Sequence, residues 1–208
     1  MSDLLPLFPL PNVVLFPNVF LPLHIFEPRY REMIAAALAS DRLIGMALLR
    51  PGWDRDYEGR PPVYPIGCSG VITHAEHLAD GRYDIVLRGL DRFRIVREDH
   101  ERSFRRAVVD PVPEPAVAGD DRRIIRESRS KLEAMLANDP RVGDAKVPSS
   151  MADVDLVNAL AQYLDLEPVE KQALLEKPCL RTRAASLVEL LEMKTMVAQA
   201  PWVSDLAH

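Results

Sequence analysis

The sequence predicts an α+β protein in which a strand-rich N-terminal half precedes a helical C-terminal half. Between residues 43 and 112, short apolar runs alternate with turn residues, which is typical of an antiparallel barrel or sandwich. From residue 120 onward, apolar residues recur at helical spacing in four successive stretches, which favours a helical bundle. A proline-rich connector at 111–115 separates the two patterns. We therefore expect one unit at residues 1–115 and a second at residues 116–208.

The first 38 residues combine a proline-broken apolar run with a helix. Each proline fixes φ and removes a backbone donor, so we expect short extended pieces here and no central strand. These prolines are Pro6, Pro9, Pro11, Pro17 and Pro22. Pro28 suits the first position of a helix, and Glu27 before it favours the positive end of the helix dipole. The pattern predicts a single helix from Pro28 to Leu38, inserted among the strands.

Extended runs and turns alternate after this helix. We expect extended runs at 43–49, 63–67, 71–75, 83–88, 93–96 and 103–112. Turns are expected at 67–70, 79–81 and 89–91, where glycines interrupt the apolar pattern. The segment from Pro51 to Pro62 is rich in charge and glycine and is predicted to be a surface loop.

Four helices are expected in the C-terminal half. The first covers 120–136, and the second starts with a capping-box-like sequence at Ser150. The third is a short helix that begins at Pro168, and the fourth covers 180–199. Asn138-Asp139-Pro140 is expected to end the first of them. In the second, Leu156, Leu160 and Tyr163 share one apolar face. Such faces can bury one shared core, so a bundle packed against the strands is predicted.

Five short blocks of this sequence resemble one known family. They are Pro6-Leu7-Phe8-Pro9-Leu10, Val13-Val14-Leu15-Phe16-Pro17, Leu21 to Tyr30, Asp80 to Tyr83, and Arg88 to Phe93. Together they resemble the N-terminal substrate-recognition domain of Lon-type ATP-dependent proteases, over essentially the whole chain. The resemblance implies a PUA-like β-barrel followed by a helical bundle.

The same resemblance does not extend to catalysis. No glycine in the sequence is followed by lysine, so a Walker A loop cannot be present. Lon enzymes also use a Ser-Lys dyad in a separate domain, for which no room follows the helices. We therefore expect a stand-alone, non-catalytic member without ATPase and peptidase domains and without a cofactor. His74 and His77 would point to opposite faces of a strand, so no metal site is predicted.

The family resemblance implies a module that binds proteins or peptides, with unfolded or extended polypeptide segments as partners. The candidate contact residues are His24, Phe26, Arg29, Tyr30, Trp53 and Tyr57. A structural alternative stays open, in which His24 is satisfied in the barrel wall, Tyr30 packs on the strands and the loop aromatics are half-buried.

Binding of RNA is the alternative function, because PUA-like barrels in other families bind RNA. Residues 82–106 carry eight arginines against five acidic residues. The whole chain, however, has a formal charge of −5, which disfavours a nucleic-acid partner. Neither a signal peptide nor a membrane-spanning run is expected. Cys68 and Cys179 lie far apart in the chain and indicate no disulfide framework, so reduced thiols and a cytoplasmic location are expected.

Overall fold

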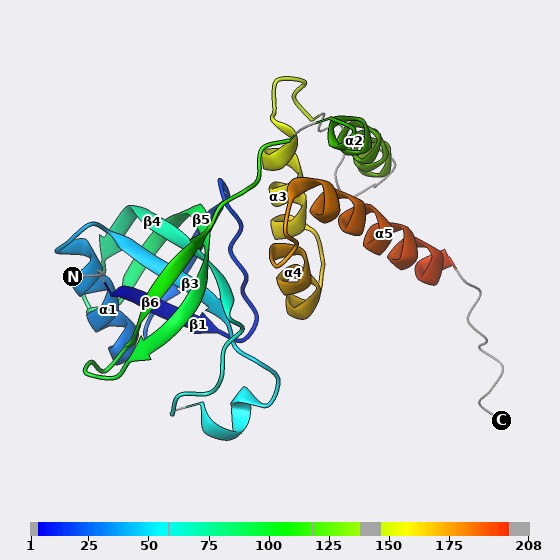
Figure 1. The fold of residues 1–208 in the computed structure, drawn as a ribbon. Coiled ribbons are helices and arrows are strands. Elements are labelled where there is room, and N and C mark those ends of the chain that lie inside the picture. Colours follow the sequence, from blue (N-terminus) through cyan, green and yellow to red (C-terminus); the bar gives the residue numbers. More distant parts are fainter. Residues whose placement is uncertain (1–3, 58, 118, 138–146, 200–208) are drawn as a thin grey trace, which may run out of the picture.

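The computed structural model describes residues 4–57, 59–117, 119–137 and 147–199. Figure 1 shows the strands gathered with the first helix in one half, and the remaining helices in the other. The strands are β1 (Leu5–Leu10), β2 (Phe20–Ile25), β3 (Leu43–Leu48), β4 (Ile66–His77), β5 (Tyr83–Asp99) and β6 (Arg105–Val112). The helices are α1 (Pro28–Leu38), α2 (Asp121–Ala137), α3 (Asp153–Tyr163), α4 (Pro168–Leu175) and α5 (Leu180–Gln199), with a 3-10 turn at Trp53–Asp56. The α+β prediction is confirmed.

The six strands form one sheet in the order β2-β5-β4-β3-β1-β6. Strand β6 also pairs with β5, so the pairings run in a ring through β5, β4, β3, β1 and β6. The long β5 makes this possible, because its first half pairs with β2 and its second half pairs with β6. One pair, β1 with β3, is parallel, whereas the sequence pattern predicted an antiparallel sheet throughout.

Strand β1 contradicts the expectation that no central strand could form among the prolines. It pairs with β6 over Leu5–Leu7 and with β3 over Leu7–Leu10. Pro6 and Pro9 therefore each lie where the strand has one registered neighbour, and the missing amide hydrogen can face the other side. The prolines restrict the strand to this staggered pairing and do not exclude it.

The turn predicted at 67–70 is wrong, because these residues lie inside β4. A Cβ at Gly67 would come within 2.3 Å of the Met46 carbonyl oxygen and 2.6 Å of the Phe93 ring. The glycine therefore permits close packing between neighbouring strands, which is the other common reason for glycine in a strand.

The turn predicted at 89–91 is also wrong, because β5 continues through it. A Cβ at Gly89 would lie 2.0 Å from the Phe16 carbonyl oxygen. The backbone of the segment before β2 approaches so closely that Asn18 N–H donates to Gly89 O at 3.0 Å and Gly89 N–H donates to Val19 O at 2.9 Å. At 79–81 the predicted hairpin turn is confirmed, with Gly81 at a φ of 82°.

Most helix predictions are confirmed. Helix α1 begins at Pro28, and α4 begins at Pro168 behind a capping box formed by Glu167 and Glu170. Helix α3 differs from its prediction, because Ala152 occupies the N-cap position and Ser150 lies outside the helix. Helix α2 ends at Ala137, and the predicted terminator at 138–140 lies outside the described residues.

Two large apolar clusters form the core. One lies between the sheet and α1 and includes Tyr30, Met33 and Ile34 of the helix. The other joins α2, α3, α4 and α5 with the strand-rich half. Its buried members from the strand-rich half are Val14, Phe16, Val19, Leu48 and Ile66. The bundle and the sheet thus share a core, and the boundary at residue 115 stays a prediction. No helix in the described ranges is long and apolar enough to cross a bilayer.

Candidate functional site

Strand β2 lies at one end of the strand order and presents an exposed face. It pairs with β5 alone among the named strands of the described chain. Phe20, Pro22 and His24 are exposed, whereas Leu21 and Leu23 between them are partly covered. Phe20 is 50% exposed, and Phe26, just after the strand, is 61% exposed. Large apolar side chains on an exposed strand face are typical of a contact surface.

His24 occupies the middle of this face and is held by charged neighbours. Its Nδ1 lies 2.6 Å from Asp84 Oδ1, and Arg82 donates to its Nε2 at 3.1 Å. The His24 and Phe26 rings stack with their centroids 6.3 Å apart. His24 is therefore exposed and fixed in place, and is not enclosed in the barrel wall.

A second group of contacts holds the 51–62 loop against the start of α1. The Tyr57 hydroxyl donates to Glu27 Oε1 at 2.6 Å, and Arg29 Nε donates to Glu27 Oε2 at 3.0 Å. The Arg29 guanidinium lies 4.7 Å from the centre of the Tyr30 ring and 5.0 Å from that of Tyr57, as in cation–π pairs. Trp53 meets Tyr57 edge-on at 5.5 Å. Glu27, predicted to act at the helix dipole, thus also anchors the loop.

Tyr30 is a core residue. It is 4% exposed, its ring lies 4.5 Å from that of Phe8, and its hydroxyl donates to the Pro9 carbonyl at 3.4 Å. Burial raises the pKa of its hydroxyl above the ordinary tyrosine value. Of the six predicted contact residues, Tyr30 is therefore the buried one, packed between α1 and the strands.

Two exposed aromatic residues, Phe20 and Tyr163, are not among the contact residues predicted from the sequence. Tyr163 was expected in the apolar face of α3 but is 65% exposed, and its hydroxyl donates to the Phe20 carbonyl at 2.8 Å. Phe20 itself belongs to the period-two alternation of β2, in which Phe20, Pro22 and His24 share a face. The sequence shows Leu21, Leu23 and Ile25 as an apolar face at period two, but Phe20 is itself apolar, so no polar residue marks its position as exposed.

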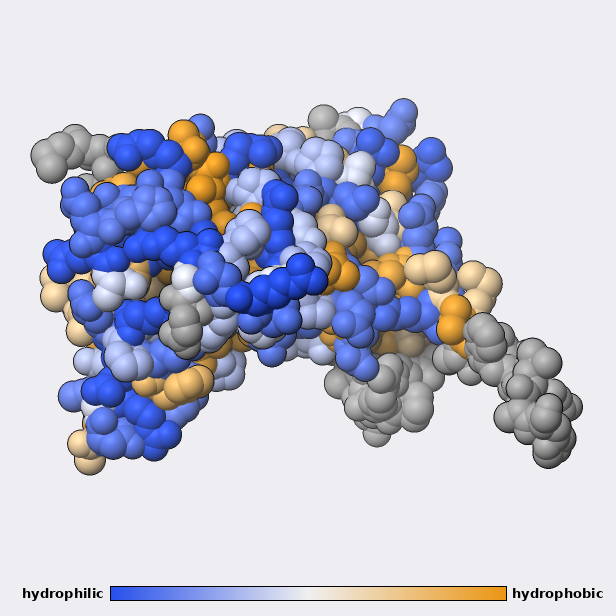
Figure 2. Space-filling model, turned by 90° about the horizontal axis from the view of Figure 1, so that it is seen from below, coloured by the Kyte–Doolittle hydropathy of each residue, from blue (hydrophilic) through white to orange (hydrophobic). Residues whose placement is uncertain are grey.

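Three further exposed apolar residues lie near the C-terminal end of α5. Met193, Met196 and Val197 are each more than half exposed. Figure 2 shows hydrophobic residues gathered at this outer end of α5. Because α5 runs away from the sheet (Figure 1), they are separate from the surface of β2.

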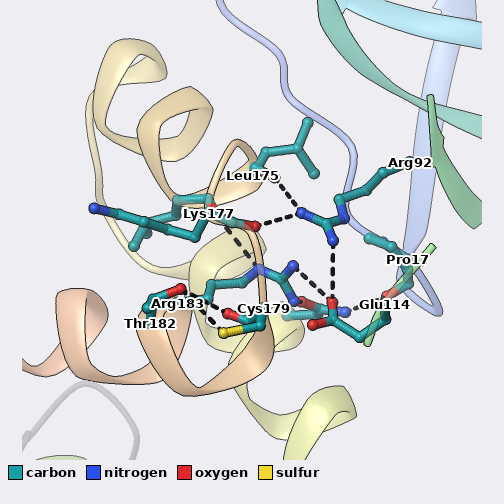
Figure 3. Close-up of polar contacts among 10 residues, drawn as sticks. Pro17, Arg92, Glu114, Leu175, Lys177, Cys179, Thr182 and Arg183 are labelled. Atoms are coloured by element: carbon teal, nitrogen blue, oxygen red, sulfur yellow. Dashed lines mark hydrogen bonds and ion pairs between the residues drawn. The ribbon is translucent and has the colours of Figure 1, made fainter. Parts of the chain in front are cut away.

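The contact between sheet and bundle is polar at its centre (Figure 3). Arg183 of α5 donates to Glu114 Oε2 at 2.8 Å, to Asn158 Oδ1 at 3.2 Å and to the Leu174 carbonyl. Arg92 of β5 lies 3.5 Å from the same Glu114 oxygen. Burial and the neighbouring Arg183 lower the pKa of Arg92. Two buried guanidinium groups therefore share one carboxylate.

The two cysteines differ in environment. Cys68 in β4 is fully buried, and burial raises the pKa of its thiol. Cys179 precedes α5, and a contact with Thr182 Oγ1 at 3.5 Å lowers the pKa of its thiol. Within the described residues, no three or more His, Cys, Asp or Glu side chains are grouped so as to hold a metal ion.

Comparison with known proteins decides the family. Residues 4–193 match the family described as the ATP-dependent protease La (LON) substrate-binding domain. This chain belongs to that family. The resemblance given by the N-terminal blocks is therefore confirmed over nearly the whole sequence.

Curated relatives of this Lon substrate-binding domain are much longer proteins. A "Lon protease 2" of Myxococcus xanthus is 27% identical over 198 residues, which covers 92% of this chain and 24% of the relative. A "Lon protease" of Trichlorobacter lovleyi is 30% identical over 185 residues, covering 84% and 22% respectively. The chain thus spans about a quarter of the length of the relatives it matches.

Solved structures show the same fold. The N-terminal domain of a Mycobacterium avium complex Lon protease superimposes with a TM-score of 0.67 at 21% identity, covering 91% of this chain and 98% of that one. A Lon N-terminal domain protein from Xanthomonas campestris gives 0.61 at 22% identity, covering 90% and 98%. The prediction of a Lon N-terminal, protease-related domain is confirmed.

Proposed function

We propose that this Lon substrate-binding domain is a non-catalytic module that holds unfolded or extended polypeptide segments on the exposed face of β2. The family match supports a role in substrate recognition. The observation that carries the location is the exposure of two phenylalanines, Phe20 and Phe26, at the two ends of this strand. Contiguous exposed apolar side chains with a polar rim mark contact sites in soluble proteins.

Side chains, and not a complete ladder of backbone hydrogen bonds, would hold the partner. Pro22 lies in the middle of β2 and has no amide hydrogen, and prolines of edge strands direct the missing donor toward the open side. An added strand would therefore lose a hydrogen bond at that point. The rings of Phe20 and Phe26 remain as the main apolar contacts.

The strength of such binding follows from the exposed area. Covering about 100 Å² on each half-exposed phenylalanine ring would contribute roughly 2–3 kcal/mol per ring. The entropy lost on association offsets much of this sum, so weak and reversible binding is expected. Weak binding suits a module that holds many different sequences, because apolar contacts discriminate little among them.

Polar groups border this apolar surface. His24 lies between the phenylalanines with both ring nitrogens engaged by Asp84 and Arg82, so the half-exposed Asp84 carboxylate offers a hydrogen-bond acceptor to a partner backbone. The predicted contacts at Arg29, Trp53 and Tyr57 stay part of the proposal as a second, half-buried aromatic site.

The proposal also includes the absence of catalytic activity and a cytoplasmic location. The match covers a substrate-binding domain and about a quarter of the curated relatives, so it brings no catalytic residues with it. Two cysteines that are not paired with each other suit a reducing compartment.

The test is binding of a fluorescent, permanently unfolded model protein, measured by anisotropy. Phe20→Ser and Phe26→Ser should each weaken binding by about tenfold or more, since each removes most of one ring contact. Val96→Ser on β5 is the matched control, because Val96 is 54% exposed but lies outside β2. Equal binding by all four proteins, or no binding by the folded wild type, would contradict the proposal.

RNA binding finds less support in the structure. Five of the eight arginines of residues 82–106 are engaged in ion pairs: Arg82, Arg92, Arg102, Arg105 and Arg106. Their charge is therefore locally cancelled. A salt-dependent shift with single-stranded RNA would restore this alternative, and a flat titration at low salt would end it.

A further inference from the structure

A cavity of about 470 Å³ lies where the sheet meets the bundle. Its wall is largely aliphatic, with Leu90, Val112, Val117, Val154 and Leu180. Its charged lining consists of Asp91, Arg92, Glu114 and Asp153. This size and this mixture of apolar wall and few polar groups are typical of sites for small ligands.

The positive charge beside this cavity is incompletely compensated. Arg92 is 2% exposed, and its Nη2 has no hydrogen-bond partner among the described residues. Glu114, at 3.5 Å, is the carboxylate beside it, and that group already accepts a 2.8 Å hydrogen bond from the fully buried Arg183. Two formal positive charges thus share one negative charge. The carbonyls of Leu175 and Lys177, which accept from Arg92 Nη1, supply only partial charges.

We propose that the cavity binds a small carboxylate with an aliphatic body, whose carboxylate group contacts Arg92 and whose body fills the aliphatic wall. A guanidinium group matches a carboxylate in shape and charge, and the pair is strong where water is excluded. The cavity is lined by Pro17 and Asn18, which precede β2, and by no residue of β2 itself, so the proposal rests on the cavity and not on the polypeptide binding proposed for β2.

The acidic neighbours set the conditions for entry. Asp153 accepts from Arg129 at 2.7 Å, and Arg129 also pairs with Glu133 at 2.7 Å. Asp91 is exposed at the cavity, and Glu114 is 30% exposed and covers Arg92 Nη2. An incoming carboxylate competes with Glu114 for Arg92, so the Glu114 side chain turns toward solvent when the ligand binds. Removal of the Glu114 charge should therefore strengthen binding.

The probe is N-acetyl-leucine, titrated by isothermal calorimetry and by amide chemical shifts of the whole chain. N-acetyl-leucinamide is the matched control, since it differs only in lacking the carboxylate. A decapeptide ending in leucine, with a free or an amidated C-terminus, distinguishes a peptide end from a free small molecule. We expect the acid to bind and the amide to bind at least tenfold more weakly.

Three variants give effects of different sign. Glu114→Gln should tighten binding of N-acetyl-leucine by about threefold or more, because it removes a competing negative charge. Arg92→Lys keeps the charge but loses the planar fork, and should weaken binding by about tenfold. Ala152→Phe places a ring at the cavity wall, where Ala152 is exposed, and should abolish binding while sparing the buried arginines.

Folding of each variant is checked by circular dichroism before titration. Equal affinity for acid and amide, or weaker binding by Glu114→Gln, would overturn the proposal. So would chemical shift changes confined to residues outside the cavity. Binding of N-acetyl-leucine without binding of the free-ended peptide would support a small molecule as the ligand, and binding of the free-ended peptide without binding of N-acetyl-leucine would overturn the proposal.

Discussion

Replacement of Arg183 by methionine should destabilise the protein strongly. The side chain is fully buried and donates to Glu114, Asn158 and the Leu174 carbonyl. Methionine has a similar length but no donor, so Glu114 keeps only the more distant Arg92 as a cation. Removal of one partner of a buried ion pair costs about 3–5 kcal/mol. For a chain of this size the melting temperature should fall by roughly 10 °C.

Urea unfolding followed by circular dichroism measures this loss. Arg123→Met is the matched control, because its ion pair with Glu127 lies on the surface of α2 and should be worth less than about 0.5 kcal/mol. Adding Glu114→Gln to Arg183→Met should increase the loss, since the buried Arg92 then has no carboxylate beside it. If Arg183→Met proves no more destabilising than Arg123→Met, the arginines do not hold the bundle on the sheet.

Two further predictions concern glycine and cysteine positions. Gly89→Ala should lower the free energy of unfolding by roughly 3 kcal/mol, because its Cβ would force the Phe16 backbone away and break two backbone hydrogen bonds. Gly52→Ala is the control, because Gly52 has open space around it but a φ of 88°, and it should cost about 1 kcal/mol. Equal losses in urea unfolding would refute this packing role. Iodoacetamide at pH 8 should label Cys179 in the native protein and Cys68 only after unfolding, because the thiolate is the reactive form and is favoured by a lowered pKa. Mass spectrometry of the digested protein checks this, and rapid native labelling of Cys68 would show that its buried environment is wrongly described.

Local sequence patterns were sufficient to predict where the helices lie. Pro28 and Pro168 mark the first turns of α1 and α4, and the apolar stripe of α5 predicted its range from Leu180 to Gln199. These patterns depend on neighbours within a few positions, where backbone restrictions act directly. The blocks of sequence near the N-terminus were equally informative about the family, because each block is a continuous run of residues and can be recognised without the tertiary structure.

The glycines show where local patterns fail. Gly67 and Gly89 were interpreted as turns, since glycine in the sequence is compatible both with a turn and with close packing. Only the approach of Phe93 and of the Phe16 backbone, from residues distant in the chain, decides between the two. For the same reason the parallel pairing of β1 with β3 was not predicted, because register depends on the partner strand.

The candidate sites divide in the same way. The sequence by itself determined the α+β class, the helices and the aromatic residues available for contact. Only the tertiary structure decided that Tyr30 is buried while Phe20 and Tyr163 are exposed. It also decided that Arg92 and Arg183 meet at Glu114. The physical reason is that exposure and charge pairing are set by packing among residues that are far apart in the chain.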